Sequence, residues 1–192
     1  MSIVQNIDLE KLEGFRTFLK DNPTKAQLSL EVKAVYEGQV GRSLVHIGKY
    51  ALDDEVIDRP TRQYTFPFGA WKEVEGALGV EGPTDRMEPV EMALAATAAC
   101  LINSVTFNAV RMGIDTDDLE ITVRSTVDPR VLFAVKDPMQ HSNCLGAIEY
   151  DVKVSGDVSD EDLETIHQLC QHSPVHGMMA EALEMEGRVA RV

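Results

Sequence analysis

The sequence predicts an α+β fold, in which antiparallel strands pack with helices that gather against one face of the sheets. Segments with the alternation or composition of strands recur along the chain, at about residues 28–34, 43–52, 62–66, 121–127 and 148–154. Between the third and the fourth of these, no residue from Met92 to Val110 is charged. This uncharged segment predicts a long central helix. The 192 residues are enough to bury a full core.

The N-terminal segment predicts a helix of its own. From about Asp8 to Asn22 apolar residues recur at helical spacing, and Pro23 ends the pattern. We therefore assign residues 1–24 to an N-terminal helical extension and residues 25–192 to a single domain. The first two strands of that domain, on either side of Gly38 and Gly41, should form a hairpin.

The central helix has well-marked ends. Pro89 suits the first helical position, because a helix leaves the N–H of that residue without an intrahelical partner. Glu88 and Glu91 place negative charge in the first turn, where the helix dipole favours it. Arg111 lies in the last turn, and Gly113 can take the left-handed conformation that closes a helix.

An uncharged helix of this length is either a membrane span or the centre of a core. Alanine supplies much of its apolar character, and polar residues such as Thr97, Asn103 and Ser104 dilute it. Membrane spans usually depend on Leu, Ile, Phe and Val instead. We therefore expect a core helix and no membrane.

The remaining segments are less regular. Residues 67–87, rich in glycine and proline, predict a loop, and residues 128–146 show no clear pattern. Ser159 is the expected N-cap of a helix that carries Cys170 on its apolar face and that Pro174 ends or kinks. The last residues, 187–192, are compatible with a short strand.

The charge and the cysteine content limit the partners and the cellular compartment that we expect for the chain. The chain has 32 acidic and 18 basic residues, a net charge of −14, so its field repels nucleic acid and anionic membranes. The N-terminus has no basic region followed by an apolar one, so we see no signal peptide. Three cysteines without a disulfide framework fit a reducing cytoplasm.

At this point the chain resembles a known family. Residues 89–100, PVEMALAATAAC, resemble the proline, glutamate, alanine-rich, cysteine motif of the OsmC/Ohr proteins. Residues 111–121, RMGIDTDDLEI, resemble the arginine, glycine, isoleucine, acidic, leucine segment that follows it there. Residues 172–175, HSPV, stand where the family commonly has cysteine-proline-valine. The resemblance covers about residues 28–192.

The resemblance implies an OsmC-like fold: an intertwined homodimer with curved antiparallel sheets around the long central helices. It also implies thiol-dependent reduction of peroxides, especially organic hydroperoxides. In that chemistry the peroxide oxidises a first cysteine to a sulfenic acid, and a second cysteine forms a disulfide with it and releases water. Neither a cofactor nor a metal is implied.

Cys100 matches the first cysteine, but Ser173 stands at the position of the second. Cys170, three residues earlier, is either a displaced resolving thiol or a small core residue. If neither Cys170 nor the partner chain resolves the oxidised thiol, an external thiol must do so. Cys144, just before a strand, is interpreted as structural.

Cys100 needs a cation to become a thiolate, because it lies too far from the helix N-terminus to gain from the dipole. Arg42 is the nearest match to the hairpin arginine that supplies this charge in the family, or else a solvated turn residue. Glu91 is about 13 Å from Cys100 along the helix, so it reaches a thiol only across a dimer or else caps the helix. In the family the supporting glutamate directly follows the proline, where this chain has Val90.

The histidines carry no convincing metal site. His172 and His176 follow Cys170 closely, but Pro174 interrupts the helical spacing and no further ligand completes a set.

Three functions stay open: an OsmC-like peroxide-reducing enzyme that uses Cys100, a catalytically silent homodimer that binds a small apolar ligand in the dimer cleft, and a structural or regulatory dimer. Methionines could wall such a cleft, namely Met87, Met92, Met112, Met178 and Met179.

Overall fold

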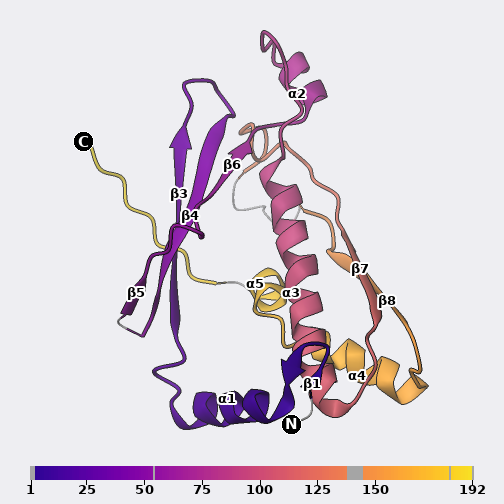
Figure 1. Ribbon diagram of the computed structural model, residues 1–192. Helices are drawn as coiled ribbons and strands as arrows, with labels where there is room; N and C mark the ends of the chain where they lie inside the picture. The colour runs from indigo at the N-terminus through magenta and orange to yellow at the C-terminus, as the bar shows by residue number, and fades with distance from the viewer. Residues whose placement is uncertain (1–2, 54, 138–144, 182, 192) are drawn as a thin grey trace. The chain divides into compact units, whose positions relative to one another are not determined.

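The computed structural model describes residues 3–53, 55–137, 145–181 and 183–191 (Figure 1). The chain divides into two compact units, Met1–Met92 and Ala93–Val192, whose boundary falls inside the central helix. In both units runs of antiparallel strands are followed by helices, which confirms the α+β class. The assignment of residues 1–24 to an extension and 25–192 to one domain stays a prediction.

The first unit contains a helix at the expected place, after two short strands. The elements of this unit are β1 (Ile3–Val4), β2 (Ile7–Asp8), α1 (Leu9–Asp21), β3 (Leu28–Tyr36), β4 (Ser43–Leu52), β5 (Glu55–Ile57), β6 (Tyr64–Phe68) and α2 (Lys72–Ala77). Helix α1 begins after Asp8, whose carboxylate accepts hydrogen bonds from the backbone N–H groups of Glu10 and Lys11 at 3.1 and 3.2 Å. It ends at Asp21, just before Pro23, as the sequence predicts.

Strands β3 and β4 form the predicted hairpin, with pairs that run from Leu28 opposite Leu52 to Tyr36 opposite Ser43. On its other edge β4 pairs antiparallel with β6 and with the short strand β5, which completes a four-stranded sheet. Strand β6 lies two residues later than predicted, and β5 was not predicted. The prediction of a loop over residues 67–87 was wrong at one place, because α2 occupies part of it.

The second unit contains the long helix and the C-terminal elements. They are α3 (Pro89–Met112), which begins in the first unit, β7 (Asp118–Arg124), β8 (Glu149–Ser155), α4 (Asp160–Cys170) and α5 (Pro174–Ala180). Ser159 caps α4 as predicted, and it forms a capping box with Asp162. Pro174 does not kink α4 but begins a separate helix. Residues 187–191 form no strand, because no neighbouring strand pairs with them.

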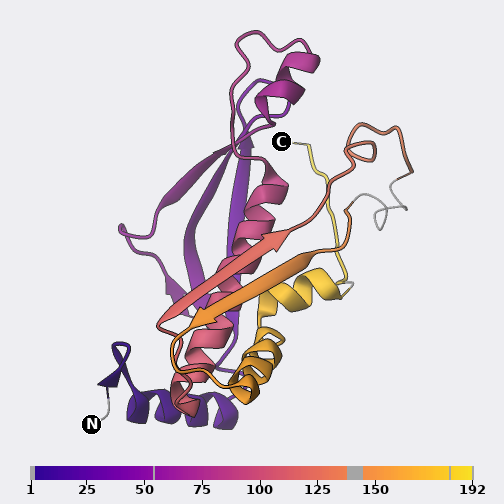
Figure 2. The same ribbon diagram turned by 90° about the vertical axis from the view of Figure 1, so that its right-hand side faces the viewer.

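Helix α3 and the C-terminal elements build the core. The buried apolar cluster joins α3, β7 and α4 through Leu101, Val105, Ala109, Ile114, Ile121, Ile166, Leu169 and Cys170. Figure 2 shows β7 and β8 running side by side next to α3. The hydroxyl of Ser104 donates a 2.6 Å hydrogen bond to the backbone oxygen of Leu169, which ties the middle of α3 to the end of α4.

Among the described residues, α3 is also the one helix long and apolar enough to cross a membrane. Core helices of folded domains meet the same length and composition test. Only 22% of its most apolar window is buried within the chain, so much of its apolar surface is uncovered.

Replacement of Ile166 by alanine tests this core. Ile166 is 2% exposed at the contact of α4 with α3, so Ile166→Ala should lower the free energy of unfolding by about 2–5 kcal/mol in urea denaturation. Leu163→Ala is the matched control, because Leu163 lies on the same helix but is 46% exposed. Equal losses in the two variants would contradict the assignment of the core.

Candidate functional site

A two-pronged ion pair stands at the tip of the β3–β4 hairpin. Nε and Nη2 of Arg42 donate to the two carboxylate oxygens of Glu75 at 2.9 and 2.8 Å. Both side chains are secluded from water, with exposed fractions of 11% for Arg42 and 4% for Glu75. Such planar, bidentate pairing fixes the orientation of a guanidinium more firmly than a single hydrogen bond does. The alternative of a solvated turn residue at Arg42 is therefore wrong.

Local backbone structure positions both partners. The hairpin turn is closed by hydrogen bonds from the N–H of Arg42 to Gln39 and from the N–H of Glu37 to Arg42, with left-handed glycines at 38 and 41. Glu75 lies on α2, a six-residue helix that follows β6. Because β6 pairs with β4 next to Arg42, with Ser43 opposite Phe68, the chain brings α2 back to the hairpin tip.

The carboxylate of Glu75 has a third partner. Its Oε2 accepts hydrogen bonds from the backbone N–H and, more weakly, the hydroxyl of Thr84, at 2.6 and 3.4 Å. The Arg42 hydrogen bonds, together with the Thr84 N–H, lower the pKa of Glu75 from 4.5 to about 2. The same pairing raises the pKa of Arg42, so both groups stay ionised at neutral pH.

One nitrogen of Arg42 remains for other chemistry. Nε and Nη2 are used by Glu75, and within the described part of the chain Nη1 donates no hydrogen bond. The site therefore presents N–H groups of a fixed, permanently charged guanidinium, which is the geometry needed to hold an anion such as a thiolate or a peroxide oxygen.

Glu91 is engaged at the start of α3 instead. One of its carboxylate oxygens accepts from the backbone N–H of Glu88 at 3.0 Å, and the other accepts from the indole N–H of Trp71 at 3.1 Å. These bonds lower the pKa of Glu91, the Glu88 bond most strongly. The contacts are those of a capping residue that also pins Trp71. A catalytic role for Glu91 stays a prediction.

The two cysteines of the second unit that the structure describes differ in their access to solvent. Cys100 lies in the middle of α3 and is partly exposed, whereas Cys170, the last residue of α4, is fully buried in the core cluster. Burial raises the pKa of the Cys170 thiol, which makes it a poor nucleophile at neutral pH. Burial also raises the pKa of Tyr150, whose hydroxyl accepts from Gln171 at 3.5 Å. Cys170 therefore has the surroundings of a packing residue.

Ser173 holds the position of the family's second cysteine and has a structural task. It is the N-cap of α5, and its buried hydroxyl accepts a 3.1 Å hydrogen bond from the backbone N–H of His176. The ring of His176 lies 6.0 Å from that of Tyr150 in an edge-on contact. No group of three described His, Cys, Asp or Glu side chains could hold a metal ion. Cys144 lies outside the described residues.

Comparisons with known proteins identify the family of this chain. The family model described as OsmC-like protein matches residues 82–186, more than half of the chain, and the chain belongs to this family. No curated protein matches the sequence. An OsmC-like protein from Mycoplasma pneumoniae superposes with a TM-score of 0.53 at 14% identity, over 79% of this chain and 87% of the other.

A second solved structure, of a proposed osmotic stress induced and detoxification response protein from Psychrobacter arcticus 273-4, gives a TM-score of 0.50 at 14% identity. It covers 77% of this chain and 85% of that one. At this identity the two likenesses show the fold alone, and they confirm the OsmC-like fold that the sequence predicts.

Sequence reasoning found Arg42 but missed Glu75 and Thr84. Arg42 and Glu91 both belong to the first unit, and their side chains contact different partners, Glu75 and Trp71. A signal for α2 was present, because Trp71, Val74 and Leu78 recur at helical spacing. The glycines and prolines around this segment indicated a loop instead, so the helix was not predicted.

The low pKa of Glu75 makes a stability profile the direct test of the pair. In the unfolded chain Glu75 is protonated below about pH 4.5, whereas in the folded chain it stays ionised down to about pH 2. The free energy of unfolding of the wild type should therefore fall as the pH decreases through this window. Glu75→Gln should be less stable at neutral pH and should show a shallower slope by up to one proton in urea titrations from pH 4.5 to 2.5.

Glu73→Gln, on the exposed side of the same helix, is the control for loss of one acidic side chain. If the free energy of unfolding of Glu75→Gln depended on pH as steeply as that of the wild type, Glu75 would not be held ionised by Arg42.

Proposed function

We propose that this OsmC-like protein reduces organic hydroperoxides in a thiol-dependent reaction and that Cys100 is the reacting residue. The observation that carries the proposal is the position of Cys100. It is the cysteine of the family motif at the centre of α3, and of the two cysteines that the structure describes it is the one with access to solvent. Peroxide attack requires a sulfur that can be reached, and the buried Cys170 offers none.

The Arg42–Glu75 pair is the proposed source of positive charge. Cys100 lies in the middle of α3, so the dipole of its own helix stabilises a thiolate only weakly. A guanidinium whose orientation is fixed by Glu75 and whose Nη1 is unused would stabilise both the thiolate and the negative charge that develops on the peroxide. In this scheme Glu75 takes the role that the motif's glutamate has in related proteins, and Glu91 caps α3.

The reaction balances with an external thiol as reductant. The Cys100 thiolate attacks one oxygen of the hydroperoxide, the O–O bond breaks, and the alkoxide leaves and is protonated to the alcohol. The resulting sulfenic acid condenses with one external thiol to a mixed disulfide and water. A second external thiol then releases Cys100 and leaves as the oxidised disulfide. We assign this step to an external thiol because, among the described residues, Cys170 is buried and Ser173 carries no thiol.

We also propose that the protein works as a homodimer in the cytoplasm. Helix α3 is strongly apolar, yet residues along one side of it are exposed, namely Ala95, Ala96, Ala99, Asn103 and Phe107. This side is suited to packing against the same helix of a second copy, because its residues are mostly small. Peroxide and external thiol are the small partners, and neither nucleic acid nor membrane is expected for a chain of net charge −14.

Replacement of Cys100 tests the proposal. Cys100→Ser should abolish reduction of cumene hydroperoxide with dithiothreitol as reductant and should remove the sulfenic acid adduct seen by mass spectrometry after dimedone trapping. Cys170→Ala is the matched control and should retain the activity, because Cys170 is a packing residue. Activity retained in Cys100→Ser would leave a catalytically silent binding protein as the better interpretation.

The role of Arg42 is tested by the pH at which Cys100 reacts. In an Arg42→Met/Glu75→Leu double variant both charges are removed together, so no buried carboxylate is left unpaired. The rate of iodoacetamide alkylation of Cys100 should then rise only at higher pH than in the wild type, because the thiolate has lost its cation. Arg16→Met, at an exposed position of α1, is the control. Identical pH profiles in all three proteins would remove Arg42 from the site.

A further inference from the structure

Glu37 is the expected cross-strand partner of Arg42, but the two side chains do not pair. They lie opposite each other where the register of the β3–β4 hairpin reaches its turn, and the N–H of Glu37 donates to the backbone oxygen of Arg42 at 3.3 Å. Directly opposed residues of opposite charge in an antiparallel pair attract each other, because their Cβ atoms are about 4.5–5.5 Å apart. Glu37 instead pairs with Arg86, and Arg42 pairs with Glu75.

Arg86 reaches Glu37 from the segment that follows α2, and packing sets its course. The N–H of Gly69 donates to the backbone oxygen of Met87 at 3.1 Å, and Phe68 forms a parallel bridge with Met87, so this segment is held against the end of β6. The stem of Arg86 runs over the buried Gly69, where an added Cβ would lie 2.9 Å from the Cβ and 3.0 Å from the Cδ of Arg86. Glycine at this position therefore leaves the room that the stem needs. The side chains of Arg86 and Glu37 are 23% and 25% exposed.

The charge of Glu37 acts on Arg42 even though the two groups are not paired. The hydrogen bonds of Glu75 raise the pKa of Arg42 most strongly, and the negative charge of Glu37 adds to the rise. Within the described part of the chain Nη1 of Arg42 donates no hydrogen bond, so it is the group that a released Glu37 carboxylate would bind. Such a bond would neutralise the guanidinium and would fill the place of any other anion.

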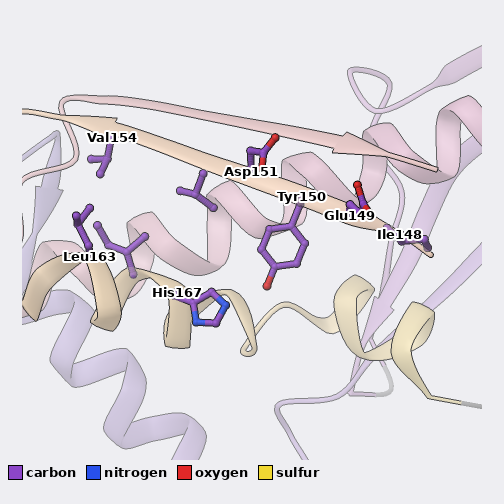
Figure 3. A pocket seen from close by; sticks show the side chains of 9 residues that line it. Ile148, Glu149, Tyr150, Asp151, Val154, Leu163 and His167 are labelled. Carbon is purple, nitrogen blue, oxygen red and sulfur yellow. The ribbon is translucent and has the colours of Figure 1, made fainter. Parts of the chain in front are cut away.

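A cavity in the second unit offers no substitute for Arg42. It has a volume of about 600 Å³ and lies between β8 and α4. Figure 3 shows Tyr150 and Val154 directed toward α4, with Leu163 and His167 opposite them. None of the nine residues that line this cavity is an arginine or a lysine. The cavity therefore supplies no permanent positive charge for an anion, and the state of Arg42 decides the proposed chemistry.

We propose that Arg86 is a positioning residue, which binds Glu37 and so keeps this carboxylate off Arg42, leaving Nη1 of Arg42 free for an anion. The inference rests on the proposed function, in which the anion is the thiolate of Cys100 or an oxygen of the hydroperoxide. In this scheme Arg86 acts through Glu37 and not on the reacting atoms. The two ion pairs divide two cations and two carboxylates in such a way that one N–H edge stays open.

The proposal predicts opposite effects for the two members of the Glu37–Arg86 pair. In Arg86→Met the released carboxylate should bind Arg42, so the rate of iodoacetamide alkylation at pH 7, followed on the Cys100 peptide by mass spectrometry, should fall by up to about tenfold. A fall of this size is expected when the pKa of a thiol rises by about 1. In Glu37→Gln no carboxylate is left to bind Arg42, so the rate should equal or exceed that of the wild type.

Two further variants test whether Arg86 acts through Glu37. The Arg86→Met/Glu37→Gln double variant should recover the wild-type rate, because the competing carboxylate is absent. Arg86→Lys should keep that rate, because it retains a cation for Glu37. Lys49→Met and Glu31→Gln are the matched controls and should leave the rate unchanged, since Lys49 and Glu31 form an exposed pair at 3.9 Å on the same two strands.

A lower rate in Glu37→Gln, equal to that of Arg86→Met, would show that the pair merely supports the hairpin and would overturn the proposal. Glu37→Gln preserves the shape of the side chain, so this result decides the matter even without Arg86→Met. A double variant that stays as slow as Arg86→Met would also overturn it, because Arg86 would then act without Glu37.

A crystal structure of Arg86→Met provides a measurement that does not depend on the thiol. It should place a carboxylate oxygen of Glu37 within hydrogen-bond distance of Nη1 of Arg42, about 2.7–3.2 Å. A Glu37 side chain that points into solvent instead would overturn the proposal. Movement of Glu37 onto Arg42 with no change in the alkylation of Cys100 in any variant would uphold the role of Arg86 and would exclude Arg42 as the cation that serves the thiol.

Discussion

Helix α3 has no charge between Met92 and Val110 and needs cover for its apolar surface, and the core of the second unit follows from that requirement. One stripe of α3, from Thr97 through Leu101 and Val105 to Ala109, is buried, and the core cluster with β7 and α4 covers it. Alanine keeps the rest of the helix narrow, so neighbouring backbones can approach closely. The hydrogen bond from Ser104 to the end of α4 fixes the depth at which the C-terminal helices dock. The same helix carries Cys100 at its centre, so the core also sets the position of the thiol.

The hairpin tip shows how a small element can organise a charged group. Helix α2 has only six residues and supplies one buried side chain, Glu75. A carboxylate held by a backbone N–H and by both prongs of Arg42 costs much less to bury than a lone charge, because each of its oxygens is satisfied. The second ion pair, Arg86 with Glu37, joins the same hairpin to the residues that follow α2. Together these contacts hold two guanidinium groups against two carboxylates from segments that are far apart in the sequence.

Sequence patterns predicted the elements whose signals are local. The capped helices α1, α3 and α4 and the hairpin of β3 and β4 begin or end within a few residues of the expected positions, because caps, prolines and alternation are read from neighbouring residues. Strand β5 and helix α2 were missed, because they are short and their stability comes from pairing with β4 and from Arg42. The partner of Arg42 followed the same rule: no motif residue indicated it, because Glu75 lies 33 residues further along the chain and reaches Arg42 through the pairing of β6 with β4. Ser173 was recognised as a departure from the family, but its capping role depends on where α4 ends.

The serine at position 173 links the stability of a helix to the number of thiols in the chain. A cysteine there would supply the second thiol of the family pattern described above, yet sulfur accepts hydrogen bonds poorly and would leave the first turn of α5 without its cap. The substitution would thus weaken α5 while it adds a thiol. A two-thiol variant of this chain would need a compensating change in the same turn.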